Sequence, residues 1–379
     1  MYNNCCKGCG FKFSLDFELK DAVRNFELDA SSANETYGIM NCWNTSEVID
    51  MSYLFSLDTN GKTGYLINEP IDCWDVSKVT TMKAMFEGAS SFNQPLYKWD
   101  VSNVKDMSFM FKGAQRFNQP LDKWVPRKLT SSSAMFQEAD SFDQPLNSWY
   151  LNNLVTTDRM FYGAKSFNQP LDLWDVSGVT NMSGMFGLAK KFNQPLNNWI
   201  VGSVTDMSEI FAEAEEFNQP LGDWDTSRVG NMKSFFSHTG SFNHPIENWI
   251  VTSVTNMNFM FFNSSKFNQP LDSWDVRQVN NMGEMFSYAK SFDQSLDSWD
   301  VSAVNYMFRM FYHAGNFHQD LCKWYNLKYQ NTPNVTEVFV ESNCFNTSDP
   351  SFDSKISFCG TSNQPYCQDQ VGKMPLHPR

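Results

Sequence analysis

The amino-acid sequence predicts an α/β solenoid, a stack of about eleven coils that each hold a short helix and a short parallel strand. The first observation is a strict repeat, because the tryptophans from Trp74 to Trp324 follow one another at intervals of 25 residues. The second is that phenylalanine recurs at the same place after almost every tryptophan, from Phe55 to Phe311. A unit this short cannot bury its apolar face alone, so we expect neighbouring units to supply the core.

The expected helix lies in the first half of each unit. In the unit that begins at Trp174, the apolar residues Met182, Met185, Phe186 and Ala189 follow the i, i+3, i+4, i+7 pattern of one helix face. The residue type and position of Ser177 also suit a helix N-cap. The pattern predicts a helix of about three turns in every coil.

The expected strand follows a corner. A proline recurs in an Asn-Gln-Pro context in most units, from Pro70 to Pro270. Proline has no amide hydrogen to donate, so a continuous parallel ladder cannot run through this column. We therefore interpret Asn-Gln-Pro as a corner and predict the strand after it, around residues 196–201.

Segments without the repeat are predicted to cap the two ends of the stack. Residues 1–41 form the expected N-terminal cap, and helical spacing of Leu19, Val23 and Phe26 predicts a helix over about residues 15–28. The solenoid is expected over residues 42–324. The cysteine-containing segment 325–379 is the expected C-terminal cap.

The overall charge and hydropathy exclude some partners. A net charge of -13 argues against nucleic acid or an anionic membrane as the main partner, because phosphate binding requires a cationic surface. No apolar run reaches the roughly 20 residues that span a bilayer. No apolar segment follows Met1, so we expect no signal peptide.

The cysteines are concentrated towards the ends, and none lies between Cys73 and Cys322. This distribution favours disulfides that stabilise the caps. Cys42 and Cys73 each precede a tryptophan in consecutive units, and stacking in register would place their Cα atoms about 5 Å apart, within the range of a disulfide. We predict that these two pair. The alternative for Cys6-Lys-Gly-Cys9, half of a zinc site, has no second pair at a suitable spacing.

No catalytic constellation is visible in the sequence. An aspartate directly follows six of the tryptophans, at Asp75, Asp100, Asp175, Asp225, Asp275 and Asp300. Such a column suggests either a carboxylate row for cations or glycans, or turns in which Asp and Ser bond nearby amides, and we favour the turns. We expect no enzyme activity, no metal and no cofactor.

The phrases DVSGVTNMSGMF and FNQPLDLWDVS are similar to the BspA-like leucine-rich-repeat surface proteins, which include a domain of unknown function first noted in mycoplasma lipoproteins. Residues 19–23 and the region from Cys344 to Cys359 resemble the end caps of the family's algal and protist members. The resemblance implies a right-handed, leucine-rich-repeat-like stack. It also implies adhesion or protein binding at the cell surface and no catalytic residues, although a cytoplasmic location stays open without a signal peptide.

The sequence leaves three classes of function open. A non-catalytic scaffold for protein binding or adhesion fits uniform coils that differ at surface positions. A structural or self-assembling matrix protein would use the long regular surface. A polysaccharide-active solenoid is disfavoured, because it would need irregular coils with a carboxylate cleft.

A candidate interaction patch lies in the C-terminal coils. Aromatic residues there occupy columns that we expect on the outer face of the helices: Phe259, Phe262, Tyr288, Phe308 and Tyr312. Contiguous apolar surface on a soluble chain often marks a binding site, here for a protein or glycan partner. The alternative is that residues 325–379 fold back and cover the patch.

Overall fold

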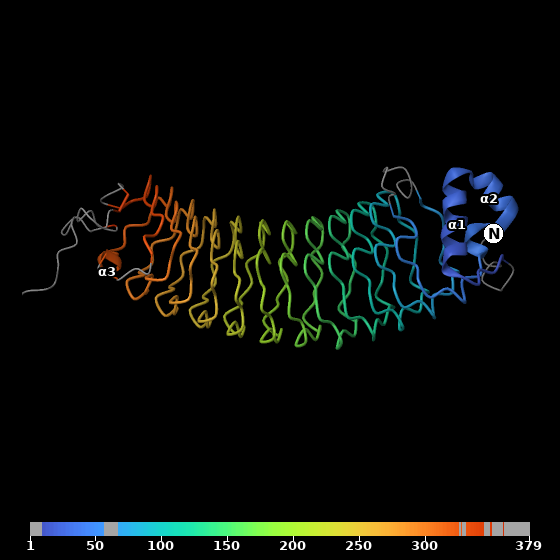
Figure 1. Ribbon diagram of the computed structural model, residues 1–379, viewed down its shortest axis with the longest axis horizontal. Coiled ribbons are helices and arrows are strands. Elements are labelled where there is room, and N and C mark those ends of the chain that lie inside the picture. Colours follow the sequence, from blue (N-terminus) through green and yellow to red (C-terminus); the bar gives the residue numbers. More distant parts are fainter. Residues whose placement is uncertain are drawn as a thin grey trace, which may run out of the picture.

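The computed structural model describes residues 10–56, 67–325, 327, 331–344, 349, 350 and 359. The repeats form a long, gently curved row of coils, with helices α1 and α2 at its N-terminal end and α3 towards the other end (Figure 1). Isolated parallel bridges join each coil to the next, as between Asn181 and Asp206. The interval of 25 residues is kept at every bridge from Thr81 to Tyr306.

The prediction of helix-plus-strand coils is wrong. In the described part of the chain the helices are α1 (Asp16–Leu28), α2 (Ala30–Tyr37), the short 3-10 helix η1 (Met40–Cys42) and α3 (Cys322–Tyr325). None of them lies within the repeats between Trp43 and Leu321, and the described coils carry single bridges instead of strands. The α/β class therefore does not apply, and the coils are built from turns.

Hydrogen bonds between coils replace those of the expected helix. In a helix the Phe186 N–H would bond the carbonyl four residues earlier, but here it donates to Ile210 in the next coil at 2.9 Å. Between such crossing bonds lie tight turns, in which the Met185 N–H donates to Met182 at 3.2 Å. The backbone N–H groups of this segment therefore alternate between closing a turn within the coil and bonding a carbonyl of the next coil.

Left-handed backbone geometry is what prevents the helix. In this unit Gly184 and Leu188 have φ angles of 61° and 57°. A residue with positive φ cannot continue a right-handed helix, but it suits the third position of a type II turn. Residues equivalent to Gly184 have positive φ in other coils too, including Ala84, Phe109, Arg159, Glu209, Ser234, Phe259, Glu284 and Arg309.

The apolar pattern still defines the core. Met182, Met185, Phe186 and Ala189 are fully buried although they form no helix. The Phe186 ring lies parallel to the equivalent rings of Phe161 and Phe211, at centroid distances of 5.8 and 5.7 Å, which confirms the predicted stacking. The core is therefore a set of continuous aromatic columns along the stack.

The Asn-Gln-Pro corner is held by side chains. The Asn168 Oδ1 atom accepts the Asn193 N–H at 2.9 Å and the Gln194 side-chain amide at 3.0 Å. The same arrangement recurs in most coils from Asn93 to Asp293. At Asn218 the Oδ1 atom accepts the Asn243 N–H, but the His244 ring bonds the Asn218 backbone carbonyl instead. The strand expected at residues 196–201 is absent, because the bridge lies in the Asn181 column instead.

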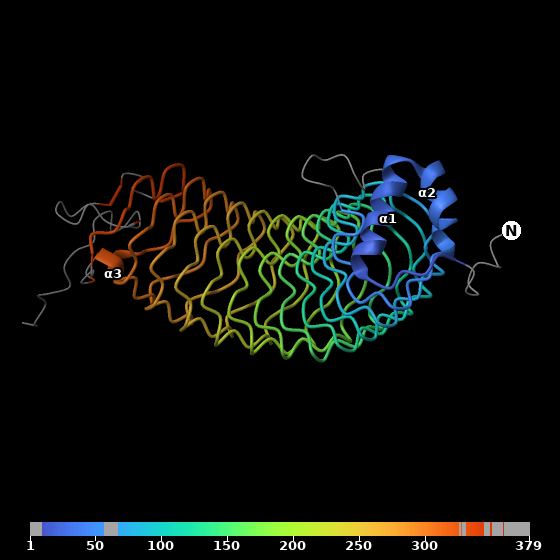
Figure 2. The same cartoon turned by 45° about the vertical axis from the view of Figure 1, so that its right-hand side comes forward.

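The N-terminal helices cover the first coil. Leu19, Ala22 and Val23 of α1 are buried, and α1 lies across the open end of the stack (Figure 2). The Asp16 carboxylate accepts the backbone N–H groups of Ile49 and Asp50 at 2.8 and 3.2 Å. The helix thus supplies apolar cover and hydrogen bonds that a preceding coil would otherwise provide.

At the C-terminal end the stack continues past the last tryptophan. Asn334 bridges to Tyr306, and the Phe339 ring stacks on Phe311 at 5.6 Å. A disulfide joins Cys344 to Cys359. These contacts extend the coil pattern into the segment predicted as the cap.

Candidate functional site

The predicted interaction residues form one row on the surface of the C-terminal coils. The Phe259 ring lies 5.4 Å from Phe262, which lies 5.8 Å from Tyr288, which in turn lies 5.6 Å from Tyr312. The Arg309 guanidinium joins Phe308 to this set, since it lies 4.8 Å from the Phe308 ring and 4.7 Å from the Tyr312 ring. We call Phe259, Phe262, Tyr288, Phe308 and Tyr312 the aromatic row.

The coil geometry places these side chains at the surface. Phe259 and Tyr288 both have φ angles of 58°, so each stands at a left-handed position of a turn. Their neighbours in sequence, such as Met260 and Phe261, point into the core and are fully buried. Each member of the row is partly exposed. Because the coils stack in register, side chains 24 and 26 residues apart in sequence meet.

Charged groups border the aromatic row. The Arg309 Nε atom lies 2.6 Å from Glu337 Oε2, which raises the pKa of the guanidinium and holds it over the two rings. Burial raises the pKa of the nearby Glu284 carboxyl. Tyr312 also has a raised pKa, chiefly because its hydroxyl is desolvated.

Sequence reasoning missed three residues at the edge of the row. His238 lies 5.0 Å from the Phe262 ring, and His313 stacks on Tyr288 at 4.8 Å. Arg309 is the third, with its contacts to two rings. All three occupy the same repeat positions as the predicted aromatic residues. Arginine and histidine at these positions are therefore the sequence signal that could have identified them.

The alternative in which the C-terminal cap buries the row is not seen in the described residues. All five side chains keep partial exposure there. Most of residues 345–379 lie outside the described part of the chain, and the role of the row in binding stays a prediction.

The aspartates that directly follow tryptophan stabilise turns. The Asp175 carboxylate accepts the Ser177 backbone N–H at 3.0 Å and its hydroxyl at 2.6 Å, which lowers the pKa of Asp175. The carboxylates of Asp75, Asp100, Asp225, Asp275 and Asp300 likewise accept the N–H two residues later. The preferred interpretation as turn chemistry is confirmed. Across the described ranges no group of three or more His, Cys, Asp or Glu side chains is placed to hold a metal ion.

Both cysteines of the predicted Cys42–Cys73 pair are disulfide-bonded. The partner of each is not established among the described residues, where the disulfide seen joins Cys344 to Cys359. A bond between Cys42 and Cys73 therefore stays a prediction. Stacking in register does hold at this place, because the Cys73 N–H donates to Asn41 Oδ1 at 3.1 Å. The zinc alternative at Cys6 and Cys9 lies outside the described residues.

The stacked coils and their repeated contacts define a tandem-repeat scaffold. Four overlapping stretches, residues 23–149, 60–173, 141–249 and 231–352, match the model of the family described as "Mycoplasma protein of unknown function, DUF285". Together these matches cover most of the sequence, and the chain belongs to this family. Neither a curated protein nor a solved structure matches it. Among the described helices, none combines the length and apolar character needed to cross a membrane.

Proposed function

We propose that this protein is a non-catalytic, BspA-like scaffold that binds a protein partner at a cell surface through the aromatic row. The observation that carries the proposal is the clustering of five partly exposed aromatic side chains on adjacent coils. The equivalent turn positions of the central coils hold Arg159, Gly184 and Glu209. Single aromatic residues such as Phe109 and Tyr162 occupy the same columns elsewhere, whereas in the C-terminal coils five of them lie on adjacent coils.

The contacts within the row favour binding. Aromatic side chains and arginine dominate the energetics of many protein interfaces. Here Arg309 is fixed by Glu337 and by two rings, so it loses little conformational freedom when a partner binds. The backbone under the row is hydrogen-bonded between coils, as from the Tyr288 N–H to the Tyr312 carbonyl at 2.7 Å, which reduces the ordering cost further.

A double substitution tests the proposal. Phe259→Ser and Phe308→Ser together remove two partly exposed rings without touching a buried core position, so the variant should fold as the wild type does. Phe109→Ser is the matched control, because Phe109 has the same backbone geometry, with a φ of 62°, in a coil far from the row. The measurement is binding of the intact chain to an array of extracellular proteins and to a glycan array.

We expect the double variant to lose the protein partner while the control retains it. Unchanged binding by a folded double variant would overturn the proposal. Binding to the glycan array alone would replace the protein partner with a carbohydrate. Concentration-dependent filaments in the absence of a partner would favour the structural-matrix alternative.

A further inference from the structure

In the central coils, cations of the chain itself cover the aromatic side chains at the repeat positions of the aromatic row. These aromatic residues are Phe109 and Tyr162. The Lys112 ammonium lies 5.5 Å from the centroid of the Phe109 ring, and the Arg159 guanidinium lies 5.7 Å from that of Tyr162. The electron-rich face of an aromatic ring attracts a cation at such distances. Each of these rings therefore has a cationic partner within its own coil.

A glutamate of an adjacent coil completes two such contacts. The Lys112 ammonium lies 2.9 Å from the Glu87 carboxylate in the preceding coil. Arg309, which covers two rings of the aromatic row, lies 2.6 Å from Glu337 in the following coil. The chain thus builds the same group twice, a cation held between an aromatic face and a carboxylate.

Phe259, Phe262 and Glu284 repeat this arrangement without the cation. The two rings lie 5.4 Å apart, and Glu284 occupies the repeat position of Phe259 in the following coil. The Phe259 N–H donates to the Gly283 carbonyl at 3.0 Å, which keeps the two coils in register there. Among the described residues, no Lys or Arg lies over either ring, and no Lys, Arg or His lies within ion-pair distance of Glu284. All three side chains are partly exposed.

Basic side chains in the neighbouring coils have partners of their own. The Lys233 ammonium lies 3.6 Å from Glu209. The His238 ring, which contacts Phe262, has its Nδ1 atom 3.0 Å from the Ser237 hydroxyl. None of these groups therefore takes the place of the missing cation.

The Glu284 carboxyl lacks compensation for its burial. Burial raises its pKa, and the positive charge on Arg309, which acts in the opposite direction, does not offset this effect. A cation placed beside the carboxyl would favour its ionised form. A cationic ligand therefore gains from the rings and from the carboxylate together.

We propose that Phe259, Phe262 and Glu284, which we call the cation site, bind a lysine or arginine side chain of the protein partner. The inference rests on the aromatic row as the partner's binding site, and it names the chemistry that the row recognises. The partner's cation would lie against the rings and beside Glu284, as Arg309 lies against two rings and beside its own glutamate. A neutral glycan or an acidic segment would leave Glu284 without this compensation.

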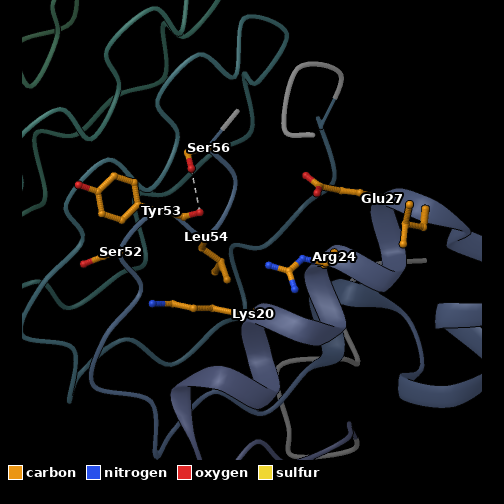
Figure 3. A pocket seen from close by; sticks show the side chains of 8 residues that line it. Lys20, Arg24, Glu27, Ser52, Tyr53, Leu54 and Ser56 are labelled. Atoms are coloured by element: carbon orange, nitrogen blue, oxygen red, sulfur yellow. Dashed lines mark hydrogen bonds between the residues drawn. The ribbon is translucent and has the colours of Figure 1, made fainter. Parts of the chain in front are cut away.

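The cavity between α1 and the first coil has a different distribution of charge. Lys20 and Arg24 line it together with the Glu27 carboxylate (Figure 3). The Lys20 ammonium already lies 3.4 Å from Asp50, and Arg24 lies 3.6 Å from Asp21. Cations and carboxylates alternate there, so that cavity does not select the sign of charge in a ligand, whereas the cation site does.

The test uses the intact chain and three pools of unstructured heptapeptides measured by fluorescence anisotropy. The first pool contains arginine among glycine, serine and leucine. The second has citrulline, a neutral side chain of nearly the same shape, in place of arginine. The third has glutamate at the same positions.

Two variants remove the two halves of the cation site. Glu284→Gln removes the charge and should not disturb folding, because burial already disfavours the ionised form. Phe259→Leu removes the aromatic face but keeps an apolar side chain. Glu209→Gln is the matched control for charge, because Glu209 is partly exposed at the same repeat position, with a φ of 58°. Phe109→Leu is the matched control for the ring, with a φ of 62°.

We expect saturable binding of the arginine pool, with affinity at least about fivefold lower for Glu284→Gln, for Phe259→Leu and for the citrulline pool. Both control variants should bind as the wild type does, and the glutamate pool should not bind. Equal losses for Glu284→Gln and Glu209→Gln would show only general attraction to an acidic chain and would overturn the proposal. Equal binding of the citrulline and arginine pools, or no saturable binding of the arginine pool, would also overturn it.

The two proposals can fail separately. If the Phe259/Phe308 double variant loses a protein partner that Glu284→Gln retains in full, the aromatic row binds that partner but the cation site is wrong. If the arginine pool depends on Glu284 while no arrayed protein depends on the row, the cation site stands and the proposed function fails.

Discussion

At the level of single residues, the left-handed turn positions are the unusual feature of this chain. Two columns of positive φ run along the stack, and most of their members are not glycine. For an L-residue this region costs about 1 to 2 kcal/mol relative to right-handed geometry. The hydrogen bonds between coils must therefore outweigh a strain that recurs in every coil.

Replacing a glycine in these columns should reveal that strain. Gly113 has a φ of 69°, and an added Cβ would meet only ordinary contacts, the nearest at 3.5 Å. We expect Gly113→Ala to lower the free energy of unfolding by about 1 kcal/mol, because alanine disfavours positive φ. Denaturant unfolding of Gly315→Ala gives the control, since Gly315 lacks positive φ and has open space around it. Equal losses in the free energy of unfolding for the two substitutions would contradict backbone strain at the positive-φ positions.

The buried ring of Phe186 allows a test of the core. Its ring is stacked between two others and lies 3.9 Å from Phe192. Phe186→Ala should lower the free energy of unfolding by about 3 to 5 kcal/mol through the cavity it leaves. Leu173→Ala, at a side chain that is 72% exposed, should change it little. Two spectroscopic probes must first show coincident transitions, since repeat stacks can unfold in segments. A loss below about 1 kcal/mol would contradict the stacked core.

At the level of the structural element, the sequence predicts the repeat, its register and its buried positions, but not the backbone. Spacing of Met182, Met185 and Phe186 fits a helix and a series of tight turns equally well, because both bring every third or fourth residue to one side. Positive φ at non-glycine residues such as Glu209 leaves no clear sequence signal. The aromatic row could be predicted because the period alone determines which side chains stack. The contacts of Arg309 with Phe308, Tyr312 and Glu337 could not be predicted, because they depend on the turn geometry.

The asparagine ladder at the corner makes a specific prediction for one element. Asn168→Ala would leave the partly buried Asn193 N–H and the Gln194 amide without their acceptor. We expect a loss of about 1 to 3 kcal/mol in the free energy of unfolding. Asn168→Asp should cost less, because Asp143 and Asp293 already fill this role in other coils. Similar losses for both substitutions would argue against the ladder as the cause.

At the level of the whole molecule, the spacing between coils explains the curvature. At one junction equivalent rings lie 5.8 Å apart in the Phe161–Phe186 column, 6.0 Å in the Phe167–Phe192 column and 6.3 Å at Trp149–Trp174. Hydrogen-bonded neighbouring strands lie only about 4.8 Å apart. The coils therefore fan open away from the bridges, and the stack curves gently along its length (Figure 1).

The aspartate turns make the stability of the stack depend on pH. Hydrogen bonds from Ser177, Ser227 and Arg277 lower the pKa values of Asp175, Asp225 and Asp275. A depressed pKa in the folded state stabilises the protein above the ordinary aspartate pKa of about 3.9, and this contribution is lost as the pH falls through the folded value. We expect thermal unfolding temperatures to fall below that pH, and to fall less steeply for Asp175→Asn with Asp225→Asn, because asparagine still accepts the bond but does not titrate. An unchanged slope would rule out these turns as the cause.

Hydrogen-bond scalar couplings test the turn-built, cross-bonded coil most directly. In a deuterated, isotope-labelled sample, a long-range HNCO experiment identifies the carbonyl that accepts each amide hydrogen. The structure predicts a coupling from the Phe186 amide nitrogen to the carbonyl carbon of Ile210, across a bond of 2.9 Å. A coupling from Phe186 to the carbonyl of Met182, four residues earlier, would show a helix and contradict this structure.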